Sequence, residues 1–555
     1  MKKHNTLKVV LITILVLLLL SWILPAAYYS GQYVNQGRTQ MGLYEMFNYP
    51  LTSLSYFGYI TFFIIFVGGF YGVLYKIPAY RTFLDKVVNL FKGKEFVFLS
   101  IIVTLIALGV SICGLQLAYF IFVPLIVSII LLMGYDKIVA GMVIIGSMAA
   151  GLIGTTYSYT NLNMLLSVLS LDLDYQIGVR FIILIAAIVL VIFNTIMYIK
   201  KTMGVVEVKK VDSKAETVKE DKVEEKIEKV PAKKNSSKKS TSTKKSTSTS
   251  SSKKKTTSSK KSTSKSTSKS RKTSKNPNKA ALKKEEIIVV KESVINDNKN
   301  DDFLIPTRVE ASHKIWPFVC GFILMFILIV LAFTSWGEGG FNVSVFTDAT
   351  SAVTKFEIFG FPIFAKIYGT MNAFGTWTVI DLLLPMALLL LIFVIIYKVS
   401  FDEVLDGFKA GAIKALYPAF IALLVYSVLV LVTYHPFQLT IYNAILGLSK
   451  GFNIATTTLV AILASLFNGD LAYVYQSSLP FYISKVTNAD NYGVVAIIFQ
   501  SMYGFTMLFA PTSMILMCVL SYLDLPYKEW LKNIWKLLLE LFIVLLIVFI
   551  ILALI

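Results

Sequence analysis

The sequence contains little of what enzymes and metal proteins use for chemistry. Its 555 residues include three cysteines and three histidines. Cys113, Cys320 and Cys518 lie in apolar segments without disulfide or metal-binding spacing, so we expect them to be small core residues. No nucleotide-binding motif of the form GxxxxGKS/T occurs, which argues against an ATP-driven pump. The apolar runs contain no charged dyad and no metal-ligand set, so an intramembrane enzyme is not expected.

Charged residues are also few, at 15% of the chain, and they are unevenly placed. Most of the net charge of +20 comes from residues 201–300, so the rest of the chain is nearly neutral. Hydrophobic residues make up 56% of the sequence, and the mean hydropathy is +0.69. Apolar runs of about twenty residues, the length that crosses a ~30 Å hydrocarbon core as a helix, recur along the chain. We therefore expect an all-α polytopic protein of the cytoplasmic membrane, surrounded by the lipid bilayer.

Composition divides the chain into a first membrane half (1–200), a linker (201–312) and a second membrane half (313–555). Basic residues near the start place the amino terminus in the cytoplasm, and the linker is expected on the same side. The Lys/Ser/Thr-rich tract 233–277 has no apolar periodicity and is expected to be disordered. A solvated linker is favoured. The alternative of another class is a membrane-anchored binder of anionic lipid or nucleic acid, with nucleic acid the less expected partner.

The stretch 453–524 is the most informative part of the sequence. Two apolar arms, 455–467 and 471–483, are each too short to cross the bilayer, and Asn468-Gly469-Asp470 separates them. This pattern predicts a re-entrant hairpin with a polar tip. The apolar run that follows, 494–523, is interrupted at Pro511, so we expect a broken transmembrane helix there. A hairpin tip beside a broken helix is how secondary transporters build a substrate site.

The first half shows the same order of elements. Residues 96–133 contain a weak helix-breaking patch at 111–116 and are interpreted as a second hairpin, with two full spans joined by a tight turn as the alternative. The run 139–169 contains the polar stretch 155–161, which favours a second broken helix. Each half then has a span, a hairpin, a broken helix and a span. Because the two hairpins are rooted on opposite sides of the membrane, the pattern predicts an inverted repeat.

The remaining segments are expected to be simple connections. Residues 28–57 are expected to lie outside, before a span over about 58–75, and residues 335–372 are interpreted as an outside loop. The segment 400–414 has amphipathic spacing and is expected to lie along the cytoplasmic face, before a separate span over 415–433.

Several motifs carry a family resemblance: Val67-Gly68-Gly69-Phe70, Gly72-Val73-Leu74, Pro124-Leu125-Ile126, Gly134-Tyr135-Asp136, Gly146 through Asn161, Ala510-Pro511-Thr512-Ser513, Leu525-Pro526-Tyr527 and Glu529-Trp530-Leu531-Lys532. In this order they resemble the four-carbon dicarboxylate anaerobic carrier family, particularly its YfcC-type members. The resemblance implies a secondary transporter of the ion transporter superfamily, with two hairpins meeting at mid-membrane. Related carriers take dicarboxylates, basic amino acids, short-chain fatty acids or aminobenzoyl-glutamate, so the resemblance does not fix the substrate. Many relatives have acidic residues where Leu115-Gln116-Leu117 follows Gly114 here, which leaves the coupling ion open as well.

The expected site lies where the tips and the breaks meet. Helix amino termini carry unpaired N–H groups and a partial positive charge, so they can hold a carboxylate without Lys or Arg. No cofactor is expected beyond a coupling ion, sodium or proton, with sodium near Asn161, Asp470 and Thr512. A homodimer is compatible with the sequence. The candidate substrate-binding residues are Gln116, Thr155, Thr156, Ser158, Thr160, Asn161, Asn468, Asp470, Gln476, Ser477, Ser478, Thr512 and Ser513.

Asp470 decides which substrate the sequence favours. A carboxylate at membrane depth is a functional candidate, unless the tip is shallow and Asp470 is a solvated turn residue. It would attract the amine of an amino acid and repel a doubly negative substrate, whereas a sodium ion bound to it would reverse this argument. The sequence thus favours a secondary carrier of a small carboxylate-bearing metabolite, an amino acid first, moved by ion coupling or exchange. A four-carbon dicarboxylate carrier is the alternative.

Overall fold

The structure is a computed structural model that describes residues 5–114, 116–216, 304–307, 314–369 and 372–554. It has two units, Met1–Met203 with Val290–Ile555, and Gly204–Val289. The first unit contains both membrane halves. The tract 233–277, predicted to be disordered, lies outside the described residues.

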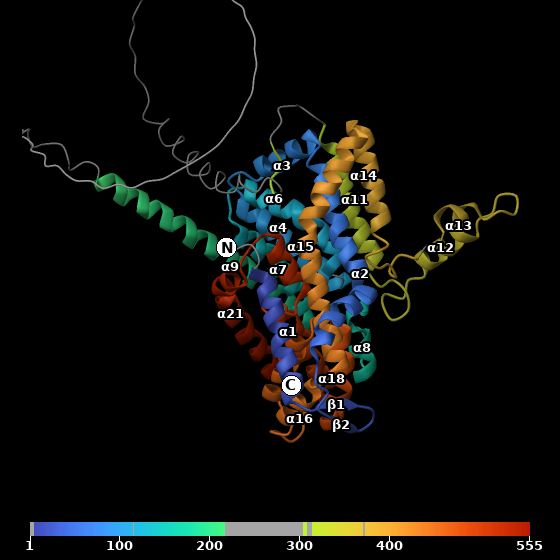
Figure 1. The fold of residues 1–555 in the computed structure, drawn as a ribbon, viewed down its shortest axis with the longest axis vertical. Helices are drawn as coiled ribbons and strands as arrows, with labels where there is room; N and C mark the ends of the chain where they lie inside the picture. Colours follow the sequence, from blue (N-terminus) through green and yellow to red (C-terminus); the bar gives the residue numbers. More distant parts are fainter. Residues whose placement is uncertain (1–4, 115, 217–303, 308–313, 370–371, 555) are drawn as a thin grey trace, which may run out of the picture. The chain divides into compact units, whose positions relative to one another are not determined.

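The chain is mainly helical, as predicted (Figure 1). Seven helices of the described part are long and apolar enough to cross a membrane. The first-half elements are α1 (Asn5–Ile23), β1 (Ala26–Tyr29), β2 (Tyr33–Gly37), α2 (Leu43–Leu74), α3 (Pro78–Leu90), α4 (Glu95–Cys113), α5 (Gln116–Tyr119), η1 (Phe120–Phe122), α6 (Val123–Leu132), α7 (Lys137–Ile153), α8 (Tyr159–Leu169) and α9 (Ile177–Glu216).

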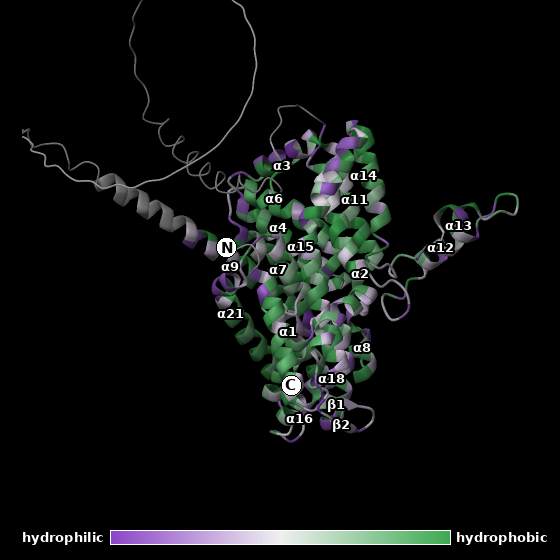
Figure 2. Ribbon diagram, in the orientation of Figure 1, coloured by the Kyte–Doolittle hydropathy of each residue, from purple (hydrophilic) through white to green (hydrophobic). Residues whose placement is uncertain are grey.

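The second half begins with two helices joined by a projecting segment (Figure 1). Its elements are α11 (Trp316–Phe333), α12 (Val345–Lys355), α13 (Ile363–Tyr368), α14 (Leu383–Tyr397), α15 (Phe401–Tyr434), α16 (Gln438–Leu446), α17 (Ile454–Phe467), α18 (Leu471–Lys485), η2 (Ala489–Asn491), α19 (Tyr492–Thr506), α20 (Met514–Tyr522) and α21 (Tyr527–Leu554). Figure 2 shows hydrophobic residues over most of the length of the bundle helices, as expected for helices that face lipid and one another.

Both predicted breaks and the second hairpin are confirmed as helix interruptions. The first broken helix stops at Ile153 and resumes at Tyr159, and the second stops at Thr506 and resumes at Met514. α17 and α18 are 14 and 15 residues long, or about 21 and 22 Å at 1.5 Å per residue, which is too short for a ~30 Å core. In the first hairpin, α4 has 19 residues and is long enough to be a span by itself.

Helices in matching positions of the two halves run antiparallel. Along the pair α2 and α15, Tyr49 lies beside His435 and Gly72 beside Gly407, so one helix ascends as the other descends. The same holds for α7 against α19 and α20, because Gly141 meets Leu523 and Ile153 meets Gly504. The element order of the first half (α2, hairpin, α7–α8, α9) is also that of the second (α15, hairpin, α19–α20, α21).

Three predictions about the connecting segments are wrong. The span predicted to begin at about residue 58 begins at Leu43 as α2, and the β1–β2 hairpin precedes it. Ser53 donates to the Leu423 carbonyl oxygen, so contact with α15 stabilises helix before the predicted start of the span. The expected loop 335–372 contains α12 and α13.

The third error concerns the segment 400–414, which is the first part of the continuous helix α15 and not a separate surface helix. Gly407 and Gly411 lie against Gly68 and Gly72 of α2, and a Cβ at any of the four would overlap the facing helix. This close backbone approach holds the amphipathic segment on α2, as small residues do between membrane helices.

Candidate functional site

The tip of the second hairpin is organised by Asp470, which begins α18. Its Oδ1 accepts a hydrogen bond from the Tyr473 N–H at 2.9 Å, so the side chain is the N-cap of that helix. Asn468 supports the turn, because its Oδ1 accepts from the Asp470 N–H at 2.9 Å. Asp and Asn are common at helix N-caps and in turns, since their short side chains bond to nearby backbone N–H groups.

This tip is seated on the second break. The Tyr503 hydroxyl donates to the Gly469 carbonyl oxygen at 2.7 Å, and the Thr512 hydroxyl donates to that of Leu466 at 2.9 Å. A Cβ on Gly469 would overlap the Thr512 carbonyl oxygen. Only glycine therefore permits this approach of the tip to the break.

The first tip is seated on the first break in the same way. Gly114 has a φ of 78°, and its carbonyl oxygen accepts a hydrogen bond from the Asn161 side-chain amide at 3.0 Å. A Cβ on Gly114 would overlap Ser158 Oγ. Behind the tip, Ser111 Oγ donates to the Gly154 carbonyl oxygen at 2.8 Å and accepts from the Thr156 N–H at 3.1 Å.

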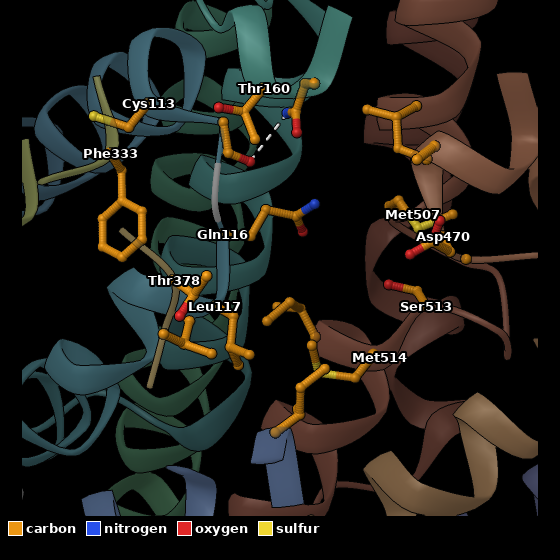
Figure 3. A pocket seen from close by; sticks show the side chains of 18 of the residues that line it. Cys113, Gln116, Leu117, Thr160, Phe333, Thr378, Asp470, Met507, Ser513 and Met514 are labelled. Carbon is orange, nitrogen blue, oxygen red and sulfur yellow. Dashed lines mark hydrogen bonds between the residues drawn. The ribbon is translucent and has the colours of Figure 1, made fainter. Parts of the chain in front are cut away.

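A cavity of about 350 Å³ lies between the two assemblies of tip and break. In Figure 3, Gln116 extends from one wall into the open space, and Asp470 and Ser513 lie on the wall opposite. Asp470 is the one charged residue among the described residues that line the cavity, and none of them is Lys, Arg or His. The lining also includes Tyr59 and Tyr426, from the antiparallel pair α2 and α15, and Trp377 and Thr378, which precede α14.

Three helices of eight or more residues begin at this cavity. Their N-caps are Ser158 for α8, Asp470 for α18 and Ser513 for α20, and each side chain accepts from a backbone N–H three residues on. The first residues of all three helices line the cavity: Thr160 and Asn161, Leu471 and Ala472, and Met514 and Ile515. The first N–H groups of a helix have no partner within the helix, so three partial positive charges point at one space. Such an arrangement binds carboxylates.

The structure brings five of the predicted site residues to the cavity: Gln116, Thr160, Asn161, Asp470 and Ser513. Five others hold the backbone of the tips and breaks without lining the cavity. Their side chains bond locally. Thr155 donates to the Leu152 carbonyl oxygen, the Thr156 hydroxyl lies 2.9 Å from Ser111 Oγ, and Ser158, Asn468 and Thr512 bond as described above.

Three other predicted residues lie further along α18 and do not line the cavity: Gln476, Ser477 and Ser478. Ser477 and Ser478 each donate to the Val474 carbonyl oxygen of their own helix, and Gln476 is exposed. Only the first turn of α18 reaches the cavity, because each later residue lies 1.5 Å further along the axis.

The residues proposed for sodium do not all converge. Asn161 and Asp470 line the cavity, whereas the Thr512 hydroxyl is bonded to Leu466. The described residues contain no group of three or more His, Cys, Asp or Glu side chains that could hold a metal ion.

The sequence reasoning missed Arg180, a fully buried arginine behind the first break. Its Nε donates to the Thr155 carbonyl oxygen at 2.9 Å, and its Nη1 donates to those of Leu173 and Tyr175 at 2.6 and 3.0 Å. Gln500 of α19 donates to the same Thr155 oxygen at 2.9 Å. Arg180 therefore joins Thr155, just after α7, to the loop before α9, and Gln500 connects the same Thr155 oxygen to the second half. Its signal in the sequence is a lone basic residue at the start of the apolar run 179–199.

Comparison with known proteins gives one family and one relative. Residues 4–249 match the family model DcuC, the C4-dicarboxylate anaerobic carriers. An uncharacterized protein of Haemophilus influenzae is 31% identical over 103 residues, which are 18% of this chain and 19% of that protein. The chain thus matches about a fifth of the length of this relative. No solved structure matches.

The family match covers the first hairpin, the first break and the start of the linker, and it stops before the second half. With the seven long apolar helices of the described part, this match supports a multi-pass membrane protein. It also supports the dicarboxylate alternative of the sequence analysis better than the amino acid. The resemblance seen in the sequence is therefore confirmed over residues 4–249, where the chain matches the C4-dicarboxylate anaerobic carrier family.

Proposed function

We propose that this protein is a secondary carrier of four-carbon dicarboxylates, and that the cavity between the two tips is its substrate site. The observation that carries the proposal is the convergence of α8, α18 and α20, whose amino termini all meet the cavity. Several helix amino termini suit a substrate with more than one carboxylate, because each can hold one anionic group. The volume of about 350 Å³ lies in the range of small-molecule sites, roughly 300–1,000 Å³.

The capping role of Asp470 weakens the main objection to a dianionic substrate. The sequence argument treated this carboxylate as a free charge that repels a dicarboxylate. In the structure its Oδ1 is occupied by the Tyr473 N–H, and it lies at the positive end of α18. The helix dipole partly offsets its charge. An amino acid, whose amine would face Asp470, is the competing substrate.

We also propose that the two halves form an inverted repeat. The antiparallel course of α2 with α15, and of α7 with α19 and α20, supports this. The parallel use of glycine supports it too, because Gly114 and Gly469 each seat a tip on the break of its own half. The repeat would place two half-sites face to face across one cavity.

Uptake by the purified full-length protein in proteoliposomes tests the proposed function. We expect saturable uptake of labelled succinate that unlabelled fumarate and malate compete and that butyrate, with one carboxylate, does not. Alanine is the amino-acid competitor. Repeating the assay with a sodium gradient, a proton gradient or internal dicarboxylate identifies the driving force. Competition by alanine without competition by any dicarboxylate would contradict the proposal.

A further inference from the structure

The segment between α11 and α14 exposes an unusual amount of apolar surface. Residues 341–367 include ten large hydrophobic side chains that are exposed, among them Val345 at 57%, Ile367 at 71% and Phe359 fully. α12 has no buried residue, and Figure 1 shows α12 and α13 projecting from the helices on either side of them. We call residues 341–369 the arm. So large an exposed apolar surface marks a contact with another phase or partner.

α12 is amphipathic. At 100° per residue, its apolar side chains, Val345, Phe346, Ala349, Ala352 and Val353, fall on one face. The opposite face consists of hydroxyl residues with Asp348 and Lys355. Figure 2 shows hydrophobic residues continuing on α13 and on the loop that joins it to α12.

The arm is tied at both ends to apolar helices of the bundle. α11 ends at Phe333, directly before it, and α14 starts at Leu383, soon after it. Both helices expose apolar side chains, as lipid-facing helices do, for example Leu324 at 63% and Leu388 at 49%. The basic residues Lys314 and Lys398 flank the other ends of this helix pair. The arm therefore leaves the bundle at the face of the membrane opposite to those lysines.

The base of the arm has the composition of a membrane–water boundary. Trp336 follows α11 and contacts the rings of Phe341 and Phe346, and Phe346 in turn contacts Phe374 beside Trp377. Tryptophan and its aromatic neighbours are enriched at this level of the bilayer, where their rings are apolar and their N–H groups stay hydrated or bonded.

We infer that the arm lies in the membrane–water interface, with the apolar face of α12 and the residues of the following loop among the lipid acyl chains. An amphipathic helix between the two apolar helices α11 and α14 fits the plane of the bilayer surface, with its polar face toward the headgroups. The lipid around the arm then also lies near the substrate cavity. Phe333 and Trp377, at the base of the arm, line the cavity, and Thr160 Oγ1 in the cavity wall lies 3.3 Å from Ser335 Oγ. This inference requires a membrane protein but not a particular substrate.

Spin labels on the full-length protein in lipid nanodiscs test the placement of the arm. Single cysteines replace Ala349 and Val353 on the apolar face, and Ser351 and Lys355 on the polar face, after Cys113, Cys320 and Cys518 are replaced. Ile392, exposed on α14, is the reference for a lipid-facing site. Collisions are measured with oxygen, which dissolves in lipid, and with a nickel chelate, which stays in water.

We expect the ratio of oxygen to nickel collisions at 349 and 353 to approach that at 392 and to exceed that at 351 and 355 several-fold. Equal, high nickel access on both faces would place the arm in water and overturn the inference. Protection of 349 and 353 from both reagents would also overturn it, because protein, such as a second copy of the chain, would then cover the face.

Discussion

Asp470 is both the N-cap of α18 and the one charge that the described residues place on the cavity wall. Asp470→Asn separates these roles, because asparagine caps helices about as well as aspartate. For a dicarboxylate substrate we expect succinate affinity to be kept or improved, since a negative charge is removed. If an amine is the natural partner, amino-acid affinity should instead fall by about tenfold or more, or ~1.4 kcal/mol. Competition uptake with succinate and alanine on the wild type and the variant distinguishes the two.

Arg180 should matter for stability and, through Thr155, for the shape of the site. Arg180→Met removes three hydrogen bonds, whereas the Thr155 carbonyl oxygen keeps its bond from Gln500. A hydrogen bond to a charged group typically contributes about 1.5–3 kcal/mol to stability. We expect a clearly lower Tm in detergent and a loss of succinate uptake. The control is Arg81→Gln, which removes a partly exposed pair with Asp85, typically worth about 0–1 kcal/mol, and a hydrogen bond to the Pro306 carbonyl oxygen. Equal Tm values for the two variants would mean that the Arg180 hydrogen bonds contribute no more to stability than the interactions of Arg81.

At the scale of elements, the crossing of α2 and α15 depends on four glycines that face one another. Gly411→Val places side-chain atoms where Gly68 and Gly72 now lie, and overpacking of this kind typically costs about 1–3 kcal/mol. We expect reduced yield of monodisperse protein and a lower Tm. Gly178→Ala is the control, because a Cβ there meets no atom within 4 Å. If Gly411→Val were as stable as this control, the helices would not pack as closely as the structure shows.

The elements that the sequence predicted best are those with a local cause. Proline, the Asn468-Gly469-Asp470 turn and the run 155–161 interrupt helices through their own backbone chemistry, so their positions could be read directly. The start of α2 at Leu43 and the continuity of α15 depend on contacts between residues far apart in the chain, such as Ser53 with Leu423. These could not be predicted from periodicity. The same holds for the site. The sequence predicted polar residues at the tips and breaks, but only the fold shows that Gln116, Thr160 and Ser513 line the cavity and that Gln476 does not.

The inverted repeat makes a prediction about membrane sidedness. Gln40 precedes α2 and Asp402 begins α15, and both are exposed. If the two halves are inverted, single cysteines at these positions should face opposite sides of the membrane. We expect a membrane-impermeant maleimide to label Gln40→Cys in intact cells and Asp402→Cys only after permeabilisation. Labelling of both from the same side would exclude the repeat.

For the whole molecule, the basic linker is expected to be separable from transport. The tract 233–277, which lies outside the described residues, contains almost no apolar side chains, so the sequence predicts no part for it in the packed membrane unit. Deletion of 233–277 should leave the KM and rate of succinate uptake unchanged at equal protein level. Loss of uptake with normal membrane insertion would instead favour a role for the tract in binding.

The account as a whole depends on the cavity between the two tips being the place where a dicarboxylate binds. Gln116 extends into this space and caps no helix, so Gln116→Cys is a suitable reporter once the three native cysteines are replaced. The control retains Cys320 alone, which is exposed on α11.

The rate of alkylation of the cysteine at 116 is measured with increasing succinate. The account predicts that saturating succinate slows this reaction by about tenfold or more, as ~90% occupancy of the site would, with half-protection at the KM of uptake. Butyrate should not protect, and the rate at Cys320 should not change. An unchanged rate at 116 under conditions in which succinate is transported would contradict the account.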